Sequence, residues 1–145
     1  LEETELILQC KMQLDEYFRG ERKTFDLPLA PKGTDFQKKV WKKLWEQSHL
    51  LSYSDFAGLC ENRAGVRAVA HAVGLNPLAV VIPCHLVVPK ESIDRIRNIR
   101  KKAEETIFKG DDLCLDKVLR DPAVDFGEYS LGRKIKRELI LKELL

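Results

Sequence analysis

The chain has 145 residues, of which 44% are hydrophobic and 33% charged, with a formal net charge of +2. This composition is typical of a soluble globular protein with one domain, or one domain and a fragment of another, and it excludes a disordered chain. The net charge is too small to indicate a nucleic-acid partner by itself. No apolar run reaches the roughly 20 residues that cross a bilayer, so no membrane association is expected.

Four cysteines are scattered along the chain without a Cys-x-x-Cys pair. The chain is not rich in cysteine and carries no signal peptide, so the pattern predicts reduced thiols and an intracellular protein. The three histidines have no metal-ligand spacing with these cysteines. No metal site is therefore predicted.

The first part of the chain predicts one amphipathic helix over Leu1–Gly20, followed by a connector over 24–33 that prolines and a glycine interrupt. Thr34 is a suitable N-cap for a second helix over Asp35–Gln47. One side of that helix is lined with lysines, which fits either a solvated face or a contact with a polyanion. These lysines are Lys38, Lys39, Lys42 and Lys43.

Two short helices should come next. Ser52 begins a capping box, which predicts a helix over Tyr53–Cys60, and Asn62 can cap another over Arg63–Val73. Two short helices joined by a tight turn form a helix-turn-helix.

The second of these helices consists mainly of small side chains, which allow its backbone to approach another surface closely. That surface is either a neighbouring helix or a nucleic-acid groove. Only Arg67 and His71 carry polar side chains long enough to contact such a surface, and they lie one turn apart on the same side of the helix.

The apolar run 76–85 contains the most reactive pair of residues. Pro77 and Pro83 restrict the backbone on both sides, and the residues between them predict a short buried strand. Cys84 and His85 follow directly. A thiol attacks carbon as a thiolate, and an adjacent imidazole can remove its proton. The alternative is that Cys84 is simply a small buried hydrophobic residue.

Three further helices are predicted after this run, over Glu91–Lys109, 112–120 and 133–145. Glu143 lies on the apolar last helix. It is either the carboxylate that orients His85 or an exposed terminal residue, and its spacing alone favours the exposed residue.

Four motifs together resemble the O6-alkylguanine-DNA alkyltransferases, also called methylated-DNA–protein-cysteine methyltransferases. The most specific is Asn-Pro followed by Pro-Cys-His over Asn76–His85. The others are Ser-Tyr at 52–53, Arg-Ala-Val at 67–69 and Gly-x-Tyr-Ser at 127–130. The resemblance runs from about Leu14 to Lys90 and resumes from Gly127 to Glu143.

This resemblance implies one irreversible turnover without a cofactor. The protein would bind double-stranded DNA through the minor groove, flip an O6-alkylguanine out of the stack and transfer its alkyl group to a cysteine. Cys84 would be the nucleophile, His85 its base through a water molecule, and Glu143 the carboxylate that polarises the histidine. Tyr53 would help to rotate the nucleotide.

The resemblance assigns the remaining site residues to two surfaces. Arg67 would fill the gap left by the flipped base, with Ala68 and His71 beside it on the DNA-facing side. Asn76 would tie the recognition helix to the active-site turn. The pocket walls would come from Val73, Val87, Tyr129 and Ser130.

The implied fold is mainly α (α+β), a compact helical domain with a winged helix-turn-helix-like motif and a short buried active-site strand. Residues 1–33 would be a remnant helix and linker of the family's amino-terminal domain, and 34–145 the DNA-binding and catalytic domain. The protein would be a monomer, cytoplasmic in a prokaryote or nuclear in a eukaryote.

Two departures from the family pattern stand out. Leu86 replaces an arginine, which removes a hydrogen-bonding group. Residues 91–126 form an apparent helical insertion that is a surface excursion, a lid or an extra basic DNA contact.

Two other functions are compatible with parts of the sequence. A non-catalytic lesion-binding protein of the alkyltransferase-like type would lack the cysteine. A cysteine hydrolase would need direct proton transfer between Cys84 and His85, which adjacent residues on one strand disfavour because they point to opposite faces.

Overall fold

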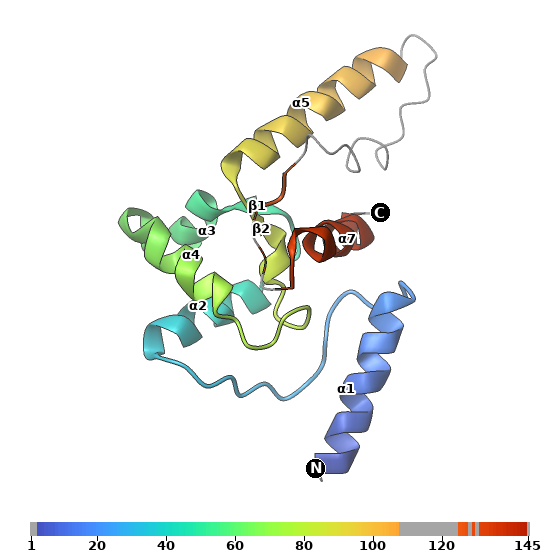
Figure 1. Cartoon of the computed structure of the whole chain (residues 1–145), viewed down its shortest axis with the longest axis vertical. Helices are drawn as coiled ribbons and strands as arrows, with labels where there is room; N and C mark the ends of the chain where they lie inside the picture. Colours follow the sequence, from blue (N-terminus) through green and yellow to red (C-terminus); the bar gives the residue numbers. More distant parts are fainter. Residues whose placement is uncertain (1–2, 108–124, 128, 130, 145) are drawn as a thin grey trace. The chain divides into compact units, whose positions relative to one another are not determined.

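The computed structural model describes residues 3–107, 125–127, 129 and 131–144 (Figure 1). These residues are mainly helical, which confirms the predicted fold class. The described part contains one sheet, a pair of two-residue strands. Among these residues no helix is both long enough and apolar enough to span a membrane. The chain divides into two compact units, Leu1–Lys32 and Gly33–Leu145.

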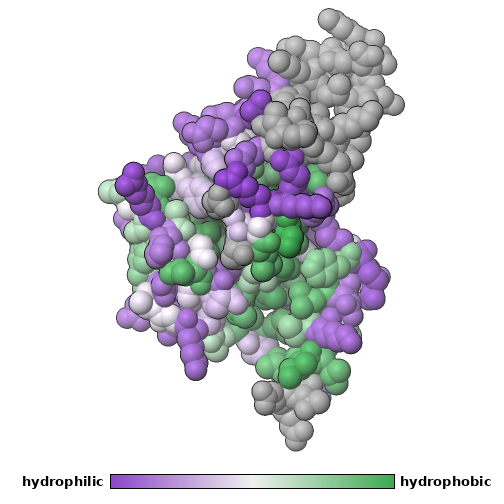
Figure 2. Space-filling model, in the orientation of Figure 1, coloured by the Kyte–Doolittle hydropathy of each residue, from purple (hydrophilic) through white to green (hydrophobic). Residues whose placement is uncertain are grey.

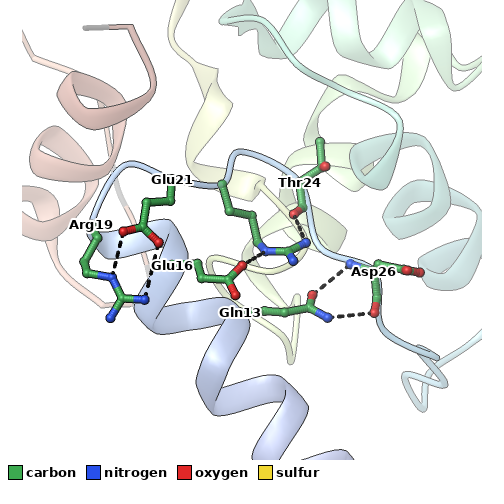
Figure 3. A network of polar contacts seen from close by, with 7 residues as sticks. Gln13, Glu16, Arg19, Glu21, Thr24 and Asp26 are labelled. Atoms are coloured by element: carbon green, nitrogen blue, oxygen red, sulfur yellow. Dashed lines mark hydrogen bonds and ion pairs between the residues drawn. The ribbon is translucent and has the colours of Figure 1, made fainter.

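The first unit consists of helix α1 (Glu3–Phe18) and the segment that follows it. The Gln13 side chain donates to the Asp26 carbonyl and accepts from the Asp26 amide, both at 2.9 Å (Figure 3). Arg22 forms an ion pair with Glu16, also at 2.9 Å. These contacts hold the extended segment against its helix. Hydrophobic side chains remain exposed along α1 (Figure 2), namely Ile7, Leu8, Met12 and Phe18.

Helix α2 (Asp35–Trp45) opens the second unit and begins at the predicted cap. Thr34 accepts from the Gln37 amide, and the Gln37 side chain accepts from the Thr34 amide, so the capping box is complete. Trp41 is 3% exposed, and its indole Nε1 donates to the Ala72 carbonyl at 2.8 Å. This bond fixes α2 to the helix that contains Ala72.

The helix-turn-helix is formed by α3 (Tyr53–Leu59) and α4 (Val66–Gly74), which pack against each other. Ser52 caps α3 by accepting from the Asp55 amide at 3.1 Å. The second helix starts later than predicted because Asn62 makes no side-chain capping bond. The short 3₁₀ helix η1 (Arg63–Gly65) takes its place before α4 begins.

Strand β1 (Leu51–Ser52) pairs in parallel with strand β2 (Val87–Val88), with Leu51 opposite Val87. The predicted strand before Cys84 is wrong, because residues 76–83 form turns and the 3₁₀ helix η2 (Cys84–Leu86) follows. The two prolines lack backbone donors. Val80 also has a φ of 74°, which no strand accommodates.

Helices α5 (Lys90–Ile107) and α7 (Arg133–Leu144) complete the second unit near their predicted positions. A buried cluster joins them to β2, formed by Val88, Ile96, Phe126, Ile140 and Leu141. The visible surface of the first turns of α5 is hydrophilic (Figure 2). The helix predicted over 112–120 lies outside the described residues.

Candidate active site

The turn that carries the cysteine is organised by Asn76, which is 7% exposed. Its side-chain Nδ2 donates to the Ile82 carbonyl at 2.8 Å, and its Oδ1 accepts from the Leu78 amide at 3.0 Å. These bonds close the turn across the left-handed residue Val80, a strained backbone position for a β-branched side chain. Asn76 therefore ties the end of α4 to the residues just before Cys84.

Cys84 lies at the surface of a cavity of about 500 Å³ and is itself 5% exposed. Burial raises the pKa of its thiol above the ordinary value. The Asn76 and Tyr129 side chains partly offset this rise in the pKa of Cys84, and the positive charge of Lys136 offsets it further. The thiol is thus mainly protonated at neutral pH and needs a base before it can attack carbon.

His85 is completely buried, and its Nε2 lies 2.7 Å from Glu143 Oε1. A carboxylate only accepts hydrogen bonds, so Nε2 carries a proton and donates a hydrogen bond to Glu143. Nδ1 then has an available lone pair, and it has no partner among the described residues. In the neutral imidazole, Nδ1 is therefore the nitrogen that can accept a proton.

Tyr129 lies close enough to the thiol for the two groups to affect each other's titration. Burial raises the pKa of Tyr129 well above its ordinary value, and the charge of the Cys84 thiolate raises it further. The Tyr129 hydroxyl therefore keeps its proton at neutral pH and is available as a donor. Its ring also meets His85 edge-on, with centroids 6.4 Å apart.

The cavity brings together residues from α3, α4, η2 and the segment before α7. They are Tyr53, Ala70, His71, Val73, Gly74, Cys84 and Tyr129. Ser130, predicted as part of this wall, lies outside the described residues. Val87 is buried and is not among these lining residues.

The outer face of α4 carries the residues predicted to meet DNA. Arg67, Ala68 and His71 are exposed, whereas Val69, Ala72 and Val73 on the same helix are buried. His71 both faces outward and lines the cavity. An exposed arginine thus stands one turn from the mouth of the pocket that holds the cysteine.

Two family models match the chain. A model of the 6-O-methylguanine DNA methyltransferase DNA-binding domain matches residues 35–105, and a model of the ribonuclease-like domain of the same methyltransferase matches residues 1–31. The chain belongs to the 6-O-methylguanine DNA methyltransferase family. The resemblance inferred from the Pro-Cys-His motif is confirmed.

Relatives from bacteria and archaea support the same family. The constitutive methylated-DNA–protein-cysteine methyltransferase of Bacillus subtilis is 47% identical over 92 residues, which cover 62% of this chain and 56% of that protein. The methyltransferase of Methanosarcina mazei is 41% identical over 90 residues, which cover 61% of this chain and 57% of that protein. The chain thus spans little more than half the length of these relatives.

Crystal structures of the Mycobacterium tuberculosis O6-methylguanine methyltransferase are similar to this fold. The protein alone matches with a TM-score of 0.65 at 28% identity, covering 93% of this chain and 64% of that one. Its complex with DNA matches with a TM-score of 0.67, and the match covers 93% of this chain and 65% of that one.

Leu86, which replaces the arginine of the family pattern, is 1% exposed. Its side chain is therefore part of the core, and a leucine there needs no polar partner.

Sequence reasoning did not identify Lys136 as a buried residue beside this site. Ile135 is 46% exposed, whereas the charged residue after it, Lys136, is 1% exposed. The available signal was its spacing, because Lys136 lies seven residues before Glu143 and so on the same face of α7. Among the described residues no group of histidine, cysteine and carboxylate side chains is arranged to hold a metal ion.

Proposed function

We propose that this protein repairs DNA by transferring an alkyl group from O6 of guanine to the Cys84 sulfur, irreversibly and once per molecule. The observation that carries this proposal is the buried His85–Glu143 hydrogen bond of 2.7 Å next to a buried thiol at the surface of a cavity. Nucleophile, base and orienting carboxylate are the parts that an activated cysteine requires.

The proton of Cys84 passes to His85 Nδ1 through a water molecule, and Glu143 stabilises the imidazolium that forms. The raised pKa of the thiol makes this base necessary. The thiolate then attacks the alkyl carbon, a carbon–sulfur bond forms, and the bond from that carbon to O6 breaks. The electron pair of that bond remains on guanine, where Tyr53 donates to a ring nitrogen as negative charge develops. The thioether product has no leaving group, so the protein is consumed.

DNA binding is assigned to the outer face of α4. Arg67 enters the base stack and fills the space of the flipped nucleotide, while the exposed Ala68 and the His71 at the rim of the cavity contact the groove. Small side chains on this helix allow the close approach that minor-groove binding requires. A damaged base costs less to unstack than a paired one. The protein acts as a monomer on double-stranded DNA, with residues 34–145 as the functional domain.

The deciding experiment is intact mass spectrometry after incubation with O6-benzylguanine or with a duplex oligonucleotide that contains O6-methylguanine. One alkyl group per protein is expected. It should be absent from Cys84→Ala and present in Cys60→Ala, the matched control at another buried cysteine.

Other results identify the alternatives. Tight binding to the lesion without any mass increase would indicate a non-catalytic lesion-binding protein. Repeated turnover of an ester or amide substrate without a stable adduct would indicate a cysteine hydrolase.

A further inference from the structure

Another cavity, which the proposed alkyl transfer does not use, lies at the start of α7. Its volume is about 370 Å³, within the range of about 300–1,000 Å³ that is typical of ligand sites. Its lining carries three cations and one carboxylate, so positive charge is in excess. The lining residues of this α7 cavity are Asp125, Phe126, Arg133, Lys134 and Arg137.

The floor of the α7 cavity is fixed by the core. Phe126 is 3% exposed and belongs to the buried cluster that joins α5, α7 and β2. The Asp125 carboxylate accepts from the Gly127 amide at 2.9 Å, and the Asp125 carbonyl accepts from the Ser92 hydroxyl. These contacts hold the floor residues in place, so the side chains that contact the floor are also restricted.

Two arginines contact this floor from α7. The Arg137 guanidinium lies over the Phe126 ring, 5.4 Å from its centroid, and Arg133 Nη1 lies 3.4 Å from Asp125 Oδ2. The two arginines are one turn apart on one face of the helix. Lys134 follows directly and is exposed. A guanidinium presents several donors in one plane, which matches the oxygens of a phosphate group.

This cluster of cations is close to the wall of the active site. Tyr129 lines the cavity that holds Cys84, and the Gly132 amide donates to the Tyr129 carbonyl at 2.9 Å. A turn closed by such a bond brings its end Cα atoms within about 7 Å, so the Cα of Arg133 is within roughly 11 Å of Tyr129. One DNA strand carries a phosphate about every 3.4 Å along the helix axis. Arg133 is therefore within about three phosphates of a nucleotide that enters the active site.

The DNA-facing side of α4 offers little charge for phosphate contacts. Its exposed residues Arg67, Ala68 and His71 include one permanent cation, and that arginine is assigned to the base stack. Half to two-thirds of protein–DNA hydrogen bonds go to phosphate and sugar, and phosphate contacts supply most of the non-specific affinity. Cations on other elements are needed for these contacts.

We propose that the α7 cavity binds phosphate groups of the DNA strand beside the flipped nucleotide, through Arg133, Lys134 and Arg137. The proposal rests on the proposed function in that it takes DNA as the partner. It concerns the affinity for a duplex and not the transfer of the alkyl group. The two proposals can therefore fail separately.

The test is the salt dependence of binding to a lesion-free duplex oligonucleotide, measured by fluorescence anisotropy. Each phosphate contact adds about 0.9 to the slope of log association constant against log salt concentration. The triple variant Arg133→Gln, Lys134→Gln and Arg137→Gln should lower this slope by about 2.7. Wild type should then lose roughly 40-fold more affinity than the variant when salt rises from about 50 to about 200 mM. Arg133→Lys with Arg137→Lys keeps the charge and should keep the slope.

Removing three cations elsewhere separates a local contact from a general loss of charge. Lys11, Arg19 and Lys32 are exposed in the first unit, and replacing all three by glutamine should leave the slope at the wild-type value. An equal decrease in both triple variants would overturn the proposal. An unchanged slope in the α7 triple variant would also overturn it.

The reaction with free O6-benzylguanine, which carries no phosphate, reports folding and chemistry separately from DNA affinity. The α7 triple variant should form the benzyl adduct at the wild-type rate. If that variant does not fold, Lys134→Gln alone should still lower the slope by about 0.9, and no change would overturn the proposal. Adduct formation with an unchanged slope would keep the proposed function and reject the phosphate contacts of the α7 cavity. A lowered slope in the variant, without any benzyl adduct in wild type, would reject the proposed function and keep this inference.

Discussion

Replacing Glu143 by glutamine tests whether the buried carboxylate controls the base. Glu143 accepts from His85 Nε2 at 2.7 Å, and its side chain is 13% exposed. Glutamine keeps the shape but loses the charge, so the imidazolium is no longer stabilised and the amide group can impose the wrong tautomer. A hydrogen bond to a charged group contributes about 1.5–3 kcal/mol. The transfer step should slow roughly 10- to 150-fold.

The assay is single-turnover benzylation by O6-benzylguanine, quenched at intervals and read by intact mass. Glu138→Gln, exposed on the same helix, is the matched control and should react at the wild-type rate. The difference between Glu143→Gln and wild type should narrow as pH rises toward the raised pKa of Cys84, because the thiolate then forms without His85. A folded Glu143→Gln protein that reacts within about twofold of wild type would refute the proton path.

Three further substitutions test other parts of the argument. Arg67→Ala should weaken repair of duplex DNA and largely keep the reaction with free O6-benzylguanine; equal loss on both substrates would exclude the flipping role. Trp41→Phe should lower the free energy of unfolding by about 1–2 kcal/mol, measured by urea denaturation, because the buried bond to the Ala72 carbonyl is lost. Glu61 has a φ of 57°, in the left-handed region that glycine adopts without strain. Glu61→Gly should therefore raise the thermal midpoint by the equivalent of roughly 0.5–1 kcal/mol, whereas Glu61→Ala should not. Equal effects of the two substitutions would contradict the strain at this position.

The sequence predicts the helices well because their signals are local. Thr34 and Ser52 are followed at capping distance by the groups they bind, and α2 and α3 begin where these caps predict. Asn62 shows the limit of such signals. Its residue type suits a cap, but the chain enters a 3₁₀ turn there and no capping bond forms.

The apolar run before Cys84 forms turns and not the predicted strand, because an apolar run is compatible with a buried strand and with a buried turn alike. The decisive interactions are the two hydrogen bonds of Asn76, which wrap the backbone around Val80. They are made by a single side chain to backbone groups. The residue pattern predicts an apolar environment for this segment, but it does not predict the path that the backbone takes.

The ionisable residues of the site depend on contacts distant in sequence. His85 and Glu143 are 58 residues apart, and Lys136 and Val87 are 49 apart. Spacing alone favours an exposed Glu143, because charged side chains on a surface helix usually face water. Only the family resemblance assigned a role to Glu143, and nothing in the sequence analysis did so for Lys136.

These two residues link the fold to the chemistry through one helix. Because they are seven residues apart, the apolar face that packs α7 also sets the spacing of its two charges. Glu143 accepts a hydrogen bond from His85, and Lys136 donates one to the Val87 carbonyl. Burial raises the pKa of the Cys84 thiol, and the positive charge of Lys136 partly offsets this rise. A shift of α7 by one residue would withdraw both charges together, which is why the packing of Leu139 and Ile140 is part of the site.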